Sequence, residues 1–209
     1  MRFGAALVVV LAVWVPGRAP ATVAEQRARL PPPAKCDDPV TGVWKSHKFD
    51  PRYNDWYIFT LTIRRVSGAE SQTKLEGSIN AHFWNGDSKQ SEPPPCGIGV
   101  RHVTVQMTAQ GSVTDSGEIH FWGTSWRPEN AYCGPPIQRG EYNLDHFSGK
   151  IDPELQEFQS VNNDGGRSVN DPTVFRRIAC DQPPPSPHVN PVAPPFQPPE
   201  TGGCLPRWL

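Results

Sequence analysis

Residues 57–64 read YIFTLTIR, and this stretch indicates the fold of the chain. Apolar side chains stand at every second position, at Tyr57, Phe59, Leu61 and Ile63, which is the period of a strand with one face turned inward. Similar alternation occurs at residues 75–83, 103–107 and 119–121. Residues 43–49 before these runs and 174–178 after them also have strand character. We expect about eight strands in the whole domain, and a helical turn only at residues 154–158.

The segments between the runs are rich in turn-forming residues. The chain has 25 prolines and 18 glycines among its 209 residues, which argues against long helices. Short turns between consecutive strands predict an all-β, antiparallel meander. Such a meander closes into an up-and-down β-barrel or, as the alternative, folds into a β-sandwich. We favour the barrel, because closure removes the exposed edges of the sheet.

Composition divides the chain into four segments. Residues 1–21 have the basic start, apolar run and small residues of a signal peptide, and the run is shorter than the roughly 20 residues that span a bilayer. Residues 22–35 form a polar and Pro-rich leader, residues 36–180 the β domain, and residues 181–209 a Pro-rich, disordered tail. We therefore expect a secreted, periplasmic or extracellular protein with no transmembrane segment in its mature chain.

The cysteines support export. All five follow the leader, where an oxidising compartment would favour disulfides. Cys36 opens and Cys180 closes the strand-rich segment, while Cys96 and Cys133 stand in Pro-rich loops. We predict the disulfides Cys36–Cys180 and Cys96–Cys133. Cys204 remains, either free, paired to another chain or competing with Cys36 for Cys180. The spacings do not resemble a zinc framework, so we expect no cysteine metal site.

Charge and motifs narrow the function classes. The formal net charge is −1, so no basic field is available to hold a nucleic acid. Ser148 lies with His146 in what reads as a turn, without the G-x-S-x-G motif of a hydrolase. The carboxylates are spaced like solvated charges, and residues 164–166 lie between strands instead of opening a helix. We expect binding or structure instead of catalysis, and no cofactor.

The sequence His-Phe-Trp occurs twice, at residues 82–84 and 120–122. The phenylalanine of each copy is in phase with the apolar face of its strand, so the histidine and tryptophan share the opposite face. Neighbouring strands lie ~5 Å apart, so the two tryptophans could form a platform and, with His102 between them, three histidines could reach a metal. A second packing surface is the alternative. We assign no metal ligand and name as candidate ligand-binding residues His82, Trp84, His120 and Trp122.

A resemblance to a known group of barrels lies at the two ends of the domain. The first strand carries Gly42-Val43-Trp44 and the last carries Arg176-Arg177. The first pattern resembles the G-x-W of the lipocalin and avidin (calycin) barrels, in which a late basic side chain packs over the tryptophan. The resemblance implies an up-and-down barrel with its ligand site inside.

Two functions from different classes follow. The first is a secreted, non-enzymatic barrel that binds a small apolar or amphipathic molecule, or a sugar. The second is a structural or adhesive cell-surface domain that acts through protein contacts and its Pro-rich tail. An open interior of ~300 Å³ or more would favour the first. The sequence predicts neither the ligand nor the oligomeric state.

Overall fold

The structure, a computed structural model, describes residues 22–67, 72–128, 133, 137, 141–161, 165 and 171–180. This part of the chain forms one helix and nine strands. They are α1 (Val23–Arg29), β1 (Gly42–Lys45), β2 (Lys48–Asp50), β3 (Asp55–Arg65), β4 (Lys74–Asn85), β5 (His102–Val113), β6 (Glu118–Pro128), β7 (His146–Asp152), β8 (Glu157–Val161) and β9 (Pro172–Ala179).

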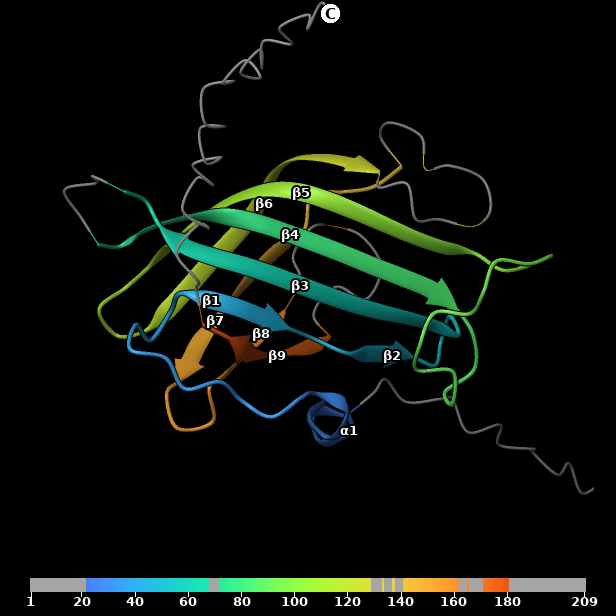
Figure 1. The fold of residues 1–209 in the computed structure, drawn as a ribbon, viewed down its shortest axis with the longest axis horizontal. Helices are drawn as coiled ribbons and strands as arrows, with labels where there is room; N and C mark the ends of the chain where they lie inside the picture. The colour runs from blue at the N-terminus through green and yellow to red at the C-terminus, as the bar shows by residue number, and fades with distance from the viewer. Residues whose placement is uncertain are drawn as a thin grey trace, which may run out of the picture.

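The strands form a closed antiparallel barrel (Figure 1). From β3 to β9 each strand pairs with the next, and β1 pairs with β9 on one side and with β3 on the other. Eight strands thus close the barrel, and β2 is an extra strand along the start of β3. The predicted meander and its closure into a barrel are both confirmed.

Apolar side chains pack together in the interior of the barrel. Phe59, Leu61 and Ile63, which alternate along β3, are buried together in one cluster, as their spacing predicts. Three aromatic rings at its centre touch one another: the centroid of Phe147 lies 4.9 Å from that of Phe59 and 4.8 Å from that of Phe175. Close packing of this kind accounts for much of the stability of a domain of this size.

One end of the barrel is closed by Trp44 and Arg177, which are opposite each other on β1 and β9. The guanidinium carbon of Arg177 lies 5.3 Å from the centre of the Trp44 ring, and both side chains are buried. Gly42 begins β1 with a φ of +131°, and a Cβ atom there would lie 2.4 Å from the carbonyl oxygen of Ala179. The packing of a basic side chain over the tryptophan is thus present.

The leader contains a helix that the sequence analysis did not predict. Thr22 and Glu25 form a capping box at the start of α1. The fully buried side chain of Gln26 donates to the carbonyl of Pro172 and accepts from the amide of Val174, both at 2.9 Å. These groups belong to the part of β9 that β1 does not reach. The amide of Gln26 therefore completes the hydrogen bonding of β9, as a neighbouring strand would.

The prediction of a helical turn at residues 154–158 is wrong. The chain makes a turn there and then enters β8, which begins at Glu157. Gln156 has a φ of +55°, a left-handed conformation that ends the turn and does not continue a helix. Its backbone carbonyl accepts a hydrogen bond from the amide of Arg177, so the turn is tied to the closed end of the barrel.

Both predicted disulfides are present. The Cα atoms of Cys36 and Cys180 are 5.5 Å apart, and those of Cys96 and Cys133 are 5.4 Å apart. The predicted signal peptide at residues 1–21, the tail at 181–209 and Cys204 lie outside the described residues. Within the described ranges α1 is the only helix, and its 7 residues are too few to cross a membrane.

Candidate ligand-binding mouth

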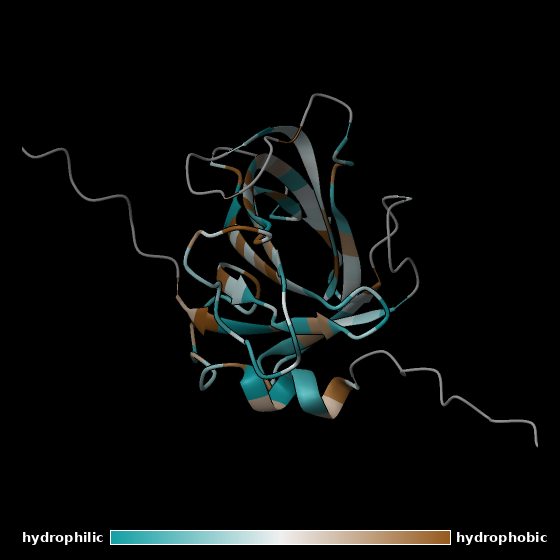
Figure 2. Cartoon of the chain, turned by 90° about the vertical axis from the view of Figure 1, so that its right-hand side faces the viewer, coloured by the Kyte–Doolittle hydropathy of each residue, from teal (hydrophilic) through white to brown (hydrophobic). Residues whose placement is uncertain are grey.

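The two ends of the barrel differ in the length of their connections. The closed end carries the short turns at residues 114–117 and 153–156. The opposite end, which we call the mouth, is where the longer connections begin and end, at residues 86–101, 129–145 and 162–171. It lies at the right of Figure 1 and faces the viewer in Figure 2. Long loops on a rigid scaffold are where binding residues usually occur.

Four half-buried aromatic side chains line the mouth. Tyr57, Phe83, Trp126 and Tyr142 pack on the outermost layer of the barrel core. Phe83 is stacked between two of them, with its ring centre 6.3 Å from Tyr57 and 5.9 Å from Tyr142. Trp126 meets Tyr142 edge-on at 6.0 Å. The four rings form a continuous aromatic surface over the apolar core.

Polar groups hold these rings in place. The hydroxyl of Tyr142 donates to Asp145 at 2.9 Å, and that of Tyr57 lies 3.4 Å from Asp55. The backbone carbonyl of Asp145, which is itself buried, accepts from the amide of Gly123 on β6 at 2.9 Å. Above the rings, the guanidinium of Arg101 lies 5.9 Å from the centre of Phe83. The mouth thus combines apolar faces with a few directed polar groups, as small-molecule sites do.

An ion-pair cluster supports the mouth beside Tyr57. Lys48 is opposite Tyr57 in the β2–β3 pair and is buried, with its amino group 3.9 Å from a carboxylate oxygen of Asp171. Burial lowers the pKa of Lys48, and the negative charges of Asp171 and Asp50 beside it partly offset this lowering. Arg52 joins both carboxylates. The cluster therefore links the β2–β3 hairpin to the start of β9.

A disulfide joins two of the loops around the mouth. Cys96 lies in the connection from β4 to β5, and Cys133 in the connection from β6 to β7. Cys133 also exchanges two backbone hydrogen bonds with His102, of 2.8 and 3.2 Å. A covalent link between loops reduces the conformational freedom that ligand binding would otherwise remove.

Exposed apolar side chains surround the same end. Tyr53, Ile98 and Leu144 are among the exposed large apolar residues. Ile98 and Leu144 lie in two of the connections at the mouth, and Tyr53 lies in the β2–β3 turn at the same end. Single exposed apolar residues are ordinary on a protein surface. Their position around a half-buried aromatic cluster extends the apolar surface outward.

The candidate residue Trp84 lies on the outer wall of the barrel, as predicted, but it is not exposed. It is 1 % exposed and packs with Trp56, Phe49 and Ile58 in a second apolar cluster. The segment 87–91 covers this cluster: the indole nitrogen of Trp56 donates to the carbonyl of Asp87, and that of Trp84 to the carbonyl of Gln90. Around Trp84 the outer wall is therefore a packing surface.

The register of the strands separates the two His-Phe-Trp copies. Trp84 is opposite His102 on β5, whereas Trp122 is opposite Gln110. These two positions on β5 are about 26 Å apart at ~3.3 Å per residue. The two tryptophans therefore do not form one platform. Trp122 is instead adjacent to His146, with ring centres 5.8 Å apart.

The histidines are divided in the same way. His82 and His102 meet through their Nε2 atoms, with ring centres 4.5 Å apart. Burial, and then the charges of His102 and Lys45, lower the pKa of His82 to about 4; burial also lowers the pKa of His102. His120 is opposite Ser112, far along β5, and its side chain is 44 % exposed. Across the described part of the chain, no three His, Cys, Asp or Glu side chains gather as metal ligands.

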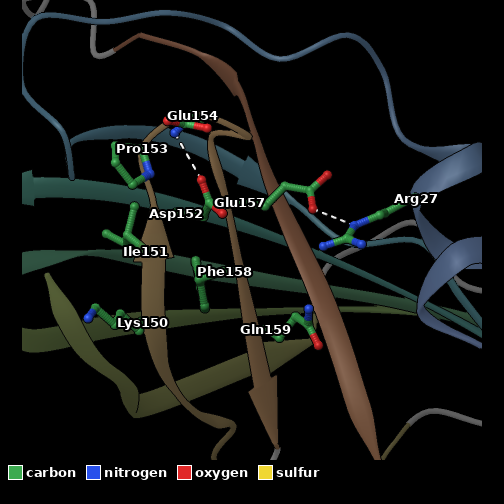
Figure 3. Close-up of a pocket in the computed structure, with 9 residues that line it drawn as sticks. All are labelled: Arg27, Lys150, Ile151, Asp152, Pro153, Glu154, Glu157, Phe158 and Gln159. Atoms are coloured by element: carbon green, nitrogen blue, oxygen red, sulfur yellow. Dashed lines mark hydrogen bonds and ion pairs between the residues drawn. The ribbon is translucent and has the colours of Figure 1, made fainter.

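A depression of about 630 Å³ lies outside the barrel, between α1 and the β7–β8 turn (Figure 3). Arg27 reaches across it from α1 to Glu157, with a nitrogen to oxygen distance of 2.6 Å. Arg176 approaches the other oxygen of the same carboxylate at 2.6 Å. Because the carboxylate of Glu157 is buried between two guanidinium groups, we interpret this contact as the joint that holds the helix to the barrel.

The residues of the mouth were not candidates in the sequence. Tyr57 and Phe83 were assigned to the core by their alternation, and their position at the end of a strand is what leaves them half-exposed. A combination of two features could have identified them: an aromatic residue on the inward-facing side of a strand, and a long connection directly after that strand. Phe83 near the end of β4 shows both. Tyr142 lies in a loop, where no periodicity applies.

Comparison with protein-family models, with curated proteins and with solved structures finds no match. The closed antiparallel barrel, with Arg177 over Trp44, is compatible with a calycin-like architecture. The chain is therefore described by its fold: an eight-stranded antiparallel β-barrel with one closed end and one aromatic mouth.

Proposed function

We propose that the protein is a secreted, non-enzymatic β-barrel that binds a small apolar or amphipathic molecule, or a sugar, at its mouth. The observation that carries this proposal is the stack of Tyr57, Phe83 and Tyr142, half-buried at the end of the barrel that has the long loops. Half-exposed rings in a row offer contact area to an apolar face at small cost in conformational entropy.

The mouth supports this function better than the interior or the outer wall does. The apolar cluster packs inside the barrel beneath these rings, so a ligand that meets the rings also meets the outer end of the core. Trp84 on the outer wall is already covered by segment 87–91. Arg101 and Asp55, at the edges of the stack, are placed to contact the polar end of an amphipathic ligand.

Secretion is part of the same proposal. Two disulfides and the predicted signal peptide both agree with an oxidising compartment. The link between the loops of Cys96 and Cys133 supports a mouth that keeps its shape before binding.

The test is a titration with the fluorescent probe 1-anilinonaphthalene-8-sulfonate, which is apolar at one end and anionic at the other. We expect one binding site on the native protein, with affinity reduced at least about tenfold in Phe83→Ala and in Tyr142→Ala. Trp122→Ala on the outer wall is the matched control and should bind normally. A melting curve of each variant tests whether that variant is folded.

A measurement on the unchanged protein complements the variants. The indole N–H resonance of Trp126 should shift on addition of the probe, while that of the buried Trp44 should not. Repeating the titration with a panel of monosaccharides separates a sugar ligand from an apolar one. If neither probe nor sugars bind, or if binding is unaffected by both mouth substitutions, the ligand-binding function is wrong and the structural or adhesive function takes its place.

A further inference from the structure

His82 and His102 form a pair on the outer wall of the barrel, away from the aromatic rings of the mouth. They are diagonal neighbours on β4 and β5, since His82 is opposite Thr104 and His102 is opposite Trp84. Their Nε2 atoms contact each other directly. Both side chains are partly exposed, and both start from hydrogen-bonded strands, so their relative position is fixed by the sheet.

The chemistry of the contact is that of two neutral imidazoles. A contact between two Nε2 atoms is a hydrogen bond when one ring offers an N–H and the other a lone pair, as two neutral imidazoles do. A neutral imidazole has one N–H and one nitrogen with a lone pair. In the pair one Nε2 therefore donates its proton to the lone pair of the other. If the donor ring moves its proton to Nδ1, both Nε2 lone pairs become available to a single ion.

We propose that His82 and His102 form a two-histidine site for a divalent transition-metal ion, with water completing the coordination. Imidazole nitrogen is a preferred ligand of zinc, nickel and copper, and the general order of stability favours Cu²⁺. To accept the ion, the rings rotate apart until both Nε2 atoms reach the ~2.0–2.1 Å typical of bonds from histidine to a metal. The pair neither gains nor loses a proton, because each ring keeps its single proton, now on Nδ1.

The surroundings set the expected strength of the site. The described residues supply no third side chain of the types that bind metals, so affinity rests on two ligands. The positive charge of Lys45, which lowers the pKa of His82, also opposes a bound cation. In favour of binding, His102 is held by its two backbone hydrogen bonds to Cys133, whose disulfide ties down the adjoining loop. We expect a single site of moderate affinity.

Trp84 provides a built-in reporter for this site. Its ring centre lies 5.2 Å from that of His82 and 6.5 Å from that of His102. Cu²⁺ quenches nearby indole fluorescence, so titration of the full chain with Cu²⁺ at neutral pH should quench part of the emission with one equivalent. Calorimetry of the same titration gives the stoichiometry and affinity directly.

The variants are His82→Asn and His102→Asn, each of which removes one ligand and should weaken Cu²⁺ binding at least about tenfold. His120→Asn is the matched control, because that histidine is exposed on the same wall but lies on β6, opposite Ser112 at the far end of β5. It should leave the first equivalent unchanged. Equal affinity in the wild type and in both pair variants would overturn the proposal, as would an absence of Cu²⁺ binding.

A measurement without substitution covers the case in which a variant does not fold. Zn²⁺ is diamagnetic, so the ring resonances of His82 and His102 should shift together as one equivalent is added, and those of His120 and His146 should not. Shifts confined to other histidines would overturn the assignment. Because none of these readouts involves the probe used for the mouth, failure of either proposal is recognised separately.

Discussion

Arg177 on β9 covers the face of Trp44 on β1 and hydrogen-bonds the segment that leads into β1. Its guanidinium donates to the carbonyls of Asp38 and Thr41 and to the side chain of Gln156. One cation on β9 thus joins the segment before β1 to the β7–β8 turn. Since its exposed fraction is only 1 %, the charge is stabilised by these acceptors and by the indole face instead of water.

We expect Arg177→Lys to destabilise the protein by about 3 kcal/mol, because lysine cannot supply the planar fork that reaches several acceptors at once. Urea unfolding measures the loss. Arg127→Lys is the control: Arg127 is exposed and bonded to Gln106, so its replacement should change stability by less than about 0.5 kcal/mol. Equal effects of the two substitutions would contradict the role of Arg177.

Gln26→Ala should destabilise the protein by about 1–3 kcal/mol, because it leaves the amide of Val174 and the carbonyl of Pro172 without their partner. Hydrogen exchange gives the residue-specific readout: the Val174 amide should lose protection while the amides of β4 and β5 keep theirs. Gln159→Ala, at an exposed position on β8, serves as the control. Unchanged protection of Val174 would mean that the helix is not what completes β9.

The tryptophans of the two His-Phe-Trp copies should differ in their effect on stability. Trp84→Ala removes a fully packed ring from the outer cluster and should cost ~3–5 kcal/mol. Trp122→Ala should cost about 1 kcal/mol or less, because that ring is only half-buried on the outer wall. Thermal melts of the two variants make the comparison. Equal losses would mean that Trp122 belongs to a packed surface as well.

Stability should fall as the pH is lowered from 6.5 towards 4. The pKa of His82 is about 4 in the folded protein against an ordinary 6.5, so the unfolded chain binds a proton that the native protein excludes in this interval. The contribution of His82 is therefore fully favourable above pH 6.5 and is lost progressively below it. Urea midpoints at several pH values measure this slope. His82→Gln should reduce it, leaving the part that comes from His47 and His102, whose pKa values burial also lowers. An unchanged slope would contradict the burial of a neutral ring.

The period of two was sufficient to predict most of the barrel. Strand β3 shows it most clearly, since Phe59, Leu61 and Ile63 all face inward. Strand β7 could not be predicted, because Phe147 and Ile151 are its only buried positions and Ser148 and Gly149 between them resemble a turn. Helix α1 does carry a signal, the capping box of Thr22 and Glu25, but it is too short for apolar periodicity to appear.

The site was harder to predict than the fold, because it depends on register. The facing of Trp84 and Trp122 away from the core follows from alternation alone. Whether they meet depends on how far β5 is shifted against β4 and β6. The β5–β6 pairing includes a bulge at Thr124 of β6, between the pairs Thr108–Ser125 and Ala109–Gly123, that no pattern in the sequence marks. Burial of Trp84 depends in turn on a loop that folds back over the outer wall.

The side chain of Gln26 occupies a position where a second molecule could otherwise add a strand. The amide of Val174 and the carbonyl of Pro172 lie at the one stretch of β9 that β1 leaves uncovered, and an open edge of this kind is a template for self-association. A chain trimmed beyond α1 would expose these two backbone groups. We therefore expect such a chain to keep its barrel and both disulfides but to self-associate at high concentration, which the intact helix prevents.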